Sequence, residues 1–193
     1  AVNDYMKDHV TEEEINNYYK ENVYGDVNSK HILVKPDTTS DMSEDEIATK
    51  KSEAKKLAEE IIKKLNSGKT FDEVKDEYKD SIVYEELGDQ AYNASLEQNY
   101  LDEMHKLKVD EYSKTPVETS YGYHIVYKIS EGKKPELKTV KDDVIDAVVK
   151  EKQSENTKYY QETLFQIRKE ANLTFKDSSL ETKYNSYKNS LLK

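Results

Sequence analysis

The stretch that most constrains the fold covers residues 120–128 and reads Ser-Tyr-Gly-Tyr-His-Ile-Val-Tyr-Lys. Its aromatic and β-branched residues predict a strand, with a single histidine, His124, inside it. Residues 29–35 also predict a strand, with His31 near its start. A histidine in a strand is most often a hydrogen-bonded structural residue, so either one alone is a weak signal. Two such strands on either side of a helical region form a more specific pattern.

Side-chain parity predicts how these two strands present their histidines. Successive side chains of a strand point to opposite faces of the sheet. His124 therefore shares a face with Gly122 and Val126, and His31 shares a face with Leu33. If the two strands are neighbours, one face presents both imidazoles while the other packs against helices.

Helical patterns cover much of the remaining chain. Thr11, Ser43 and Thr70 are each followed three residues later by a glutamate, which is the capping-box signature of a helix start. Apolar spacing predicts further helices over about residues 95–106 and over 178–192. Residues 139–171 contain no Gly or Pro, so they predict one long helix or two consecutive ones.

Three other segments have weaker patterns. We expect residues 79–94 to be irregular, with a turn at Leu87-Gly-Asp89. Thr115-Pro116-Val117 predicts the start of an edge strand, because proline cannot donate to a ladder. Leu173-Thr-Phe175 predicts a short strand-like piece.

Composition limits the classes of function. The chain has 193 residues, 36% of them charged, and a net charge of −10, which disfavours nucleic acid and anionic membrane surfaces as partners. The absence of cysteine excludes disulfides, zinc–thiolate sites and cysteine nucleophiles. The four histidines have no metal-ligand spacing, so we expect no metal site. No membrane-spanning run or signal peptide is visible, and the opening at Ala1 in helical sequence suggests a trimmed or mature chain.

The two histidine motifs resemble those of the parvulin-type peptidyl-prolyl isomerases. Lys30-His-Ile-Leu-Val34 is similar to the first-strand motif of that family, and Tyr121-Gly-Tyr-His-Ile125 is similar to its last-strand motif, with Thr119 at the expected place before it. The resemblance implies an α+β fold, in which a four-stranded antiparallel sheet is surrounded by helices. We read the order over residues 29–131 as one strand, three helices and two strands.

The resemblance also implies the site. His31, Asp80, Thr119 and His124 would form the catalytic polar network, in which the histidines hydrogen-bond to each other while Thr119 and a carboxylate fix their tautomers. Leu96 stands where the family usually has methionine, and Tyr100 where it usually has phenylalanine; these two would seat a substrate proline ring. The remaining expected substrate-binding residues are Met104 and Tyr121.

The reaction implied is rotation about an X–Pro bond, which makes and breaks no covalent bond. It therefore requires no cofactor, nucleophile or metal. Its barrier of roughly 18–20 kcal/mol reflects the loss of amide resonance in the twisted state. A pocket can lower that barrier by removing water from the carbonyl and by binding the twisted amide better than the planar one.

The flanking segments are similar to the foldase lobe of PrsA-like extracytoplasmic lipoproteins of Gram-positive bacteria. The expected domains are residues 1–28 and 134–193, which build an appended helical lobe, and residues 29–133, which form the isomerase domain. The resemblance implies unfolded or proline-containing polypeptides as partners, and a place at the outer face of the cell membrane or in the cell wall. Membrane attachment would need a lipid anchor that this chain does not carry, and a homodimer through the helical lobe is possible.

Two alternatives stay open at this stage. The two histidines could form a buried pair that only stabilises the sheet. The chain could also be a chaperone or holdase with a weak or inactive isomerase domain, whose binding surface would include Tyr18, Tyr19, Tyr160 and Leu164.

Overall fold

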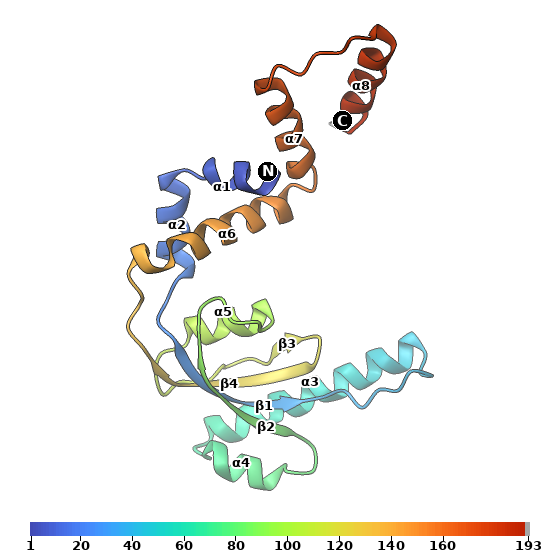
Figure 1. Cartoon of the computed structure of the whole chain (residues 1–193). Helices are drawn as coiled ribbons and strands as arrows, with labels where there is room; N and C mark the ends of the chain where they lie inside the picture. The colour runs from blue at the N-terminus through green and yellow to red at the C-terminus, as the bar shows by residue number, and fades with distance from the viewer. Residues whose placement is uncertain (192–193) are drawn as a thin grey trace. The chain divides into compact units, whose positions relative to one another are not determined.

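The computed structural model describes residues 1–191, which form two compact units (Figure 1). Unit 1 combines residues 1–23 with the chain from residue 135 onward, and unit 2 comprises residues 24–134. The domain limits expected from the sequence remain a prediction about which parts fold independently. Within the described residues, no helix has both the length and the apolar character needed to cross a membrane.

Unit 2 is built on a four-stranded antiparallel sheet with the strand order β2-β1-β4-β3. The central strands are β1 (Val27–Val34) and β4 (Gly122–Glu131), and they carry the two predicted histidines side by side. Strand β3 (Val117–Thr119) follows Pro116 and lies at the edge of the sheet, as the proline predicted. The α+β class and the adjacency of the two histidine strands are thus confirmed.

The second edge strand corrects the expectation of an irregular segment at 79–94. Residues Val83–Gln90 form β2, which pairs with β1 and has a register shift opposite Ser29 and Lys30. This strand is charged and only half buried, as is common for edges that must not pair with other chains, so it lacks a clear apolar alternation. Unit 2 therefore runs strand, two helices, strand, one helix and two strands.

Each face of the sheet packs against its own helices. Ile32, Val34 and Ile125 face α3 (Glu44–Asn66) and α4 (Phe71–Glu77), where they form an apolar core with residues such as Ile61 and Phe71. The opposite face carries α5 (Gln98–Lys106) and a second apolar cluster. That cluster includes Val27, Tyr100, Leu101, Met104 and Val126. The histidines lie on this second face.

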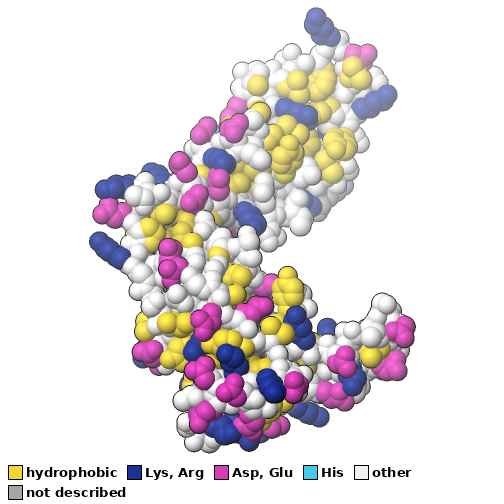
Figure 2. All heavy atoms as spheres, turned by 60° about the horizontal axis from the view of Figure 1, so that its bottom comes forward, with side chains coloured by type: hydrophobic (Ala, Val, Ile, Leu, Met, Phe, Trp, Pro, Cys, Tyr) yellow, Lys and Arg dark blue, Asp and Glu magenta, His cyan; other side chains and the backbone are white. Residues whose placement is uncertain are grey.

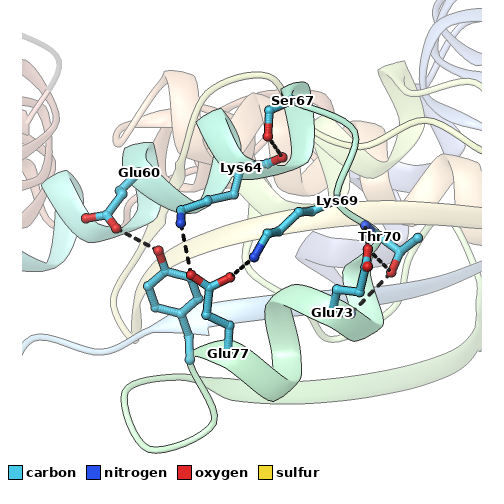
Figure 3. Close-up of polar contacts among 8 residues, drawn as sticks. Glu60, Lys64, Ser67, Lys69, Thr70, Glu73 and Glu77 are labelled. Carbon is cyan, nitrogen blue, oxygen red and sulfur yellow. Dashed lines mark hydrogen bonds and ion pairs between the residues drawn. The ribbon is translucent and has the colours of Figure 1, made fainter.

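Local capping starts three of the helices as predicted. Thr11, Ser43 and Thr70 each accept a hydrogen bond from the backbone N–H of the glutamate three residues later, and each glutamate reaches back to the cap residue. Figure 3 shows the polar contacts that hold the connection between α3 and α4, including the Thr70 cap at the start of α4. Lys64 of α3 and Lys69 of the loop both pair with the carboxylate of Glu77 on α4.

Unit 1 consists of helices. They are α1 (Val2–Asp8), α2 (Glu12–Asn22), α6 (Leu137–Glu155), α7 (Tyr159–Glu170) and α8 (Ser178–Leu191). Helix α2 packs along α6, and α1 packs against α7. The small core of the unit includes Met6, Ile15, Val144, Val148 and Phe165.

The sequence left two readings of residues 139–171, and the two-helix reading is confirmed. The helix breaks at Asn156, which has an extended backbone and accepts a hydrogen bond from the Lys158 N–H through its side chain. The predicted strand-like piece at Leu173–Phe175 is wrong, since it is a loop that follows Asn172 at φ +52°. The last predicted helix corresponds to α8, and its expected final residue, 192, lies outside the described residues.

Helix α8 buries none of its described side chains, and large apolar groups stay exposed around it. Leu180 and Tyr187 of α8 are more than half exposed, and Tyr160 of α7 is nearly so. Figure 2 shows hydrophobic side chains gathered over the part of unit 1 formed by α7 and α8.

The ends of unit 2 meet at a close backbone contact that gives a test of this fold. The Gly132 N–H donates to the Asp26 carbonyl at 2.8 Å, and a Cβ added to Gly25 would lie 1.9 Å from the Gly132 carbonyl oxygen. Gly25→Ala should therefore lower the free energy of unfolding by about 1–3 kcal/mol through overpacking. Urea denaturation of the full chain, with amide hydrogen exchange in β1 and β4 as the readout, measures this loss.

Gly132→Ala is the matched control. Its added Cβ would meet only the Asp26 backbone, at an ordinary 3.5 Å, so the free energy of unfolding should change by no more than about 0.5 kcal/mol. Equal effects of the two substitutions would contradict the close approach.

Candidate active site

A cavity of about 510 Å³ lies on the α5 face of the sheet in unit 2. Its strand side is lined by His31, Leu33, Lys35, Glu85, Leu87 and His124. Its remaining walls come from the start of α5 with the segment before it, and from the end of β3 with the β3–β4 turn. These walls consist of Ser95, Leu96, Glu97, Tyr100, Thr119 and Tyr121. Apolar and polar groups thus share one concave surface, which is typical of small-ligand sites.

The two histidines meet at the centre of the sheet. Leu33 of β1 pairs with His124 of β4, and His31 pairs with Val126, so the imidazoles are diagonal neighbours on one face. Their ring centroids are 4.7 Å apart and the rings are perpendicular, at 89°. Both side chains are buried, with 4% and 5% of the surface of the two residues exposed. The two histidines therefore share one face of the sheet, as strand alternation predicts.

The expected hydrogen bond between the two histidines does not form, and each ring pairs with a different hydroxyl. The His31 Nδ1 atom lies 3.2 Å from the Tyr100 hydroxyl, and the His124 Nε2 atom lies 2.8 Å from the Thr119 hydroxyl. The remaining nitrogens, His31 Nε2 and His124 Nδ1, are buried without a hydrogen-bond partner. A buried polar atom without a partner is costly, so these two nitrogens are unsatisfied polar groups of the site.

Tyr100 joins the polar groups to the apolar wall. Its ring lies edge-on to both imidazoles, with centroids 5.5 Å from His31 and 5.4 Å from His124. Its hydroxyl also lies 3.2 Å from the buried Ser29 hydroxyl. Burial raises the pKa of Tyr100 to about 12, so it stays a neutral hydrogen-bonding phenol.

A carboxylate fixes the turn that carries Thr119. Glu97, which precedes α5, accepts hydrogen bonds from the Ser120 backbone N–H, at 3.0 and 3.1 Å, and from the Ser120 hydroxyl. The Thr119 hydroxyl in turn accepts from the Tyr121 N–H at 3.2 Å. The β3–β4 turn is therefore tied to the start of α5, which holds Thr119 against His124.

Burial keeps both imidazoles neutral near pH 7. Desolvation lowers the pKa of His31, and the nearby Glu85 carboxylate opposes that shift. Desolvation lowers the pKa of His124 to about 4, and charge repulsion from His31 is the second largest cause of this shift. Glu97 acts in the opposite direction on His124, and Lys35 adds to the lowering. The cavity thus contains two uncharged rings that can donate or accept hydrogen bonds.

The cavity brings together six of the eight residues singled out from the sequence: His31, Leu96, Tyr100, Thr119, Tyr121 and His124. The other two lie elsewhere. Asp80 is exposed between α4 and β2 and does not line the cavity, and Met104 is fully buried in the apolar cluster beneath α5. The catalytic role expected for Asp80 and the substrate contact expected for Met104 stay predictions.

Sequence reasoning missed other cavity residues. Ser29, which bonds the Tyr100 hydroxyl from outside the cavity, was missed as well, although it shares parity with His31. Glu85 and Leu87 escaped notice because their strand was taken as irregular, and Glu97 because its partner Ser120 is distant in the sequence. No group of three or more potential metal ligands comes together within residues 1–191.

Comparison with known proteins identifies the family. The family described as "Rotamase: PPIC-type PPIASE domain" matches residues 31–130, which include both histidines and the cavity. The chain is 30% identical over 190 residues to "Foldase protein PrsA" of Bacillus subtilis (strain 168), and 32% identical over 187 residues to "Foldase protein PrsA 2" of Bacillus anthracis. These alignments cover 96% and 94% of this chain, and 56% of each relative, so the chain spans just over half of their length.

Solved structures show the same fold. The crystal structure of peptidylprolyl isomerase (PrsA) from Bacillus cereus aligns with a TM-score of 0.59 at 22% identity, over 96% of this chain and 64% of that one. The crystal structure of foldase protein PrsA from Streptococcus pneumoniae aligns with a TM-score of 0.53 at 17% identity, over 96% and 64%. At these identities the likeness concerns the fold alone, and it agrees with the parvulin-like architecture expected from the sequence. Since the family match spans residues 31–130 of 193, the chain belongs to the PPIC-type peptidyl-prolyl isomerase, or rotamase, family.

Proposed function

We propose that this chain is a peptidyl-prolyl cis–trans isomerase that acts on X–Pro bonds of unfolded polypeptides. The observation that carries the proposal is the cavity over the paired neutral histidines, which lies within the segment that matches the isomerase family. The names of the relatives, foldase protein PrsA, support a role in protein folding. No observation favours a holdase without isomerase activity.

The apolar wall supplies the seat for the proline ring. Leu96 and Tyr100 line one side of the cavity, and Leu33 lies on its strand side. Tyr100 is held in place from below by the apolar cluster that contains Met104. A ring bound there would be fixed while the residue before it turns, which is the geometry that rotation about the X–Pro bond requires.

The polar floor supplies the electrostatic environment for the amide. Water stabilises the planar, more polar amide more than the twisted one. Closing the cavity around the peptide removes this water and so lowers the barrier. His31, His124 and Thr119 offer neutral hydrogen-bonding groups in a preorganised arrangement. No covalent intermediate is required, and each group acts by binding the twisted amide more tightly than the planar one.

The cellular setting is part of the same proposal. We infer a site of action outside the cytoplasm, because the resemblance to PrsA-like foldases of Gram-positive bacteria covers the flanking helices as well as the isomerase segment. Attachment through a lipid anchor and dimerisation through unit 1 follow from that resemblance alone and stay predictions.

Exchange NMR of an Ala-Pro peptide tests the activity directly. The wild-type chain should accelerate isomerisation, whereas His124→Ala or Tyr100→Ala should reduce the acceleration at least about tenfold, since each removes a wall of the cavity. His9→Ala is the matched histidine control, because His9 stacks on Tyr5 in unit 1 and should leave the rate unchanged. Circular dichroism verifies that each variant is folded.

A folded wild-type chain without isomerase activity would refute the proposal. If that chain also suppressed aggregation of an unfolded protein, the holdase alternative would replace it. Loss of activity in His9→Ala to the same degree as in His124→Ala would place the site elsewhere.

The Tyr100 hydroxyl is predicted to serve stability more than catalysis. Tyr100→Phe keeps the ring but leaves the His31 Nδ1 and Ser29 hydroxyl without this partner, so the free energy of unfolding should fall by about 1–2 kcal/mol. Isomerisation should persist within about threefold of wild type. Tyr112→Phe, which removes a hydroxyl bonded to exposed Asn66, should change stability by less than about 0.5 kcal/mol. A tenfold loss of activity in folded Tyr100→Phe would contradict this division of roles.

The buried imidazoles predict the pH dependence. The pKa of His124 is about 4 in the folded chain and about 6.5 when unfolded, so the catalytic efficiency should be flat from about pH 8 to 6 and decline towards pH 4. As pH falls through that range, His124 becomes protonated in the unfolded chain before it does in the folded chain. Stability is therefore lost as pH falls from about 6.5 to 4, by at most about 3 kcal/mol.

His124→Gln provides the comparison, because it removes this titration. The difference in unfolding free energy between wild type and His124→Gln should change with pH only in the acidic range. An activity profile with its steepest change near pH 6.5 would show that His124 titrates as an exposed histidine.

A further inference from the structure

The wall of the cavity formed by β2 carries the negative charge of Glu85, which has no part in the proposed isomerisation. Glu85 lies opposite His31 in the β1–β2 ladder and lines the cavity, and its side chain is 56% exposed. Its Oε2 atom is 3.5 Å from His31 Nε2, too far for a strong hydrogen bond. Since burial keeps His31 neutral, this imidazole does not cancel the charge of the carboxylate.

The opposite end of the cavity carries charges of both signs. Lys35 and Glu97 both line it and act on the pKa of His124 in opposite directions. Lys35 directly follows β1, four residues beyond His31, roughly 13 Å along an extended chain. The carboxylate of Glu97 accepts hydrogen bonds from Ser120. The charge of Glu85, in contrast, raises the pKa of both His31 and Tyr100. The cavity is therefore electronegative at its β2 end.

Two buried atoms identify this cavity as a place for a ligand. His31 and His124 are more than nine-tenths buried and line it, and each has one ring nitrogen without a hydrogen-bond partner. Glu85 and Leu87 of β2 line the same cavity, so a peptide bound there would extend on both sides of its proline beside the β2 wall.

We propose that Glu85 is a specificity-determining residue that favours X–Pro segments with a lysine or arginine next to the proline. The inference rests on the proposed isomerase function and names its preferred substrates. An ammonium or guanidinium group near Glu85 gains an ion pair, and a carboxylate there meets a like charge. A partly exposed pair corresponds to a preference of up to about fivefold in kcat/KM.

Exchange NMR on three peptides that differ only at the residue before proline, Lys, Ala or Glu, tests the proposal. A second set places the same residues after proline, because a peptide can bind in the cavity in either chain direction. In at least one set the wild-type chain should act on the Lys peptide about threefold to fivefold better than on the Glu peptide. The preference should shrink in about 0.5 M NaCl, because the pair is reachable by solvent.

Variants of two adjacent glutamates separate this effect from general charge. Glu85→Gln should bring the Lys-to-Glu ratio close to one, and Glu85→Lys should invert it. Glu86→Gln removes the same charge from the neighbouring position, which lies on the opposite side of β2 and bonds the Tyr84 hydroxyl. It should leave the ratio unchanged.

Failure of the inference differs from failure of the proposed function. Equal rates on the Lys and Glu peptides of both sets, or a preference that survives Glu85→Gln, would overturn the role of Glu85 while isomerisation of the Ala peptide continues. If no peptide is isomerised, the proposed function fails. Dissociation constants from amide chemical-shift titrations of the same peptides then decide the inference. Tighter binding of the Lys peptide that is lost in Glu85→Gln supports selection by Glu85. Equal binding of the Lys and Glu peptides overturns the role of Glu85.

Discussion

The register between β1 and β4 is the constraint on which the rest of unit 2 depends. It sets Leu33 against His124 and His31 against Val126, so both imidazoles reach the same face. On the other face it sets Ile32 against Ile125, and both are fully buried beneath α3 and α4. A slip of one residue in either strand would place its histidine in the apolar core beneath α3 and α4 and its isoleucine on the α5 face. The apolar face thus fixes the position of the polar one.

The polar face is buried although its hydrogen bonding is incomplete. Tyr100 and Thr119 each satisfy one histidine nitrogen, and the other two nitrogens stay without partners. Burial removes the positive charge from both rings, so the cavity contains neutral donors and acceptors. A sequence selected only for stability would fill this place with apolar side chains. Keeping unsatisfied groups under a cavity is the local conflict expected where function limits stability.

Much of this arrangement could be predicted from the sequence, because it depends on neighbours along the chain. A capping box spans four residues, so the helix starts at Thr11, Ser43 and Thr70 were predicted correctly. Strand alternation is also local, and it placed His31 and His124 on one face once their strands were taken as partners. The family resemblance rested on these two local motifs, and the fold comparison agrees with it.

The sequence by itself determined the helix starts, the two histidine strands and their parity. Only the tertiary structure decided that 83–90 is a strand, because its pairing with β1, and not its own alternation, stabilises it. For the same reason Glu85 and Glu97 reach the cavity while Asp80 does not. These positions depend on hydrogen bonds and packing between residues far apart in the chain, where no short-range pattern records which partners will meet.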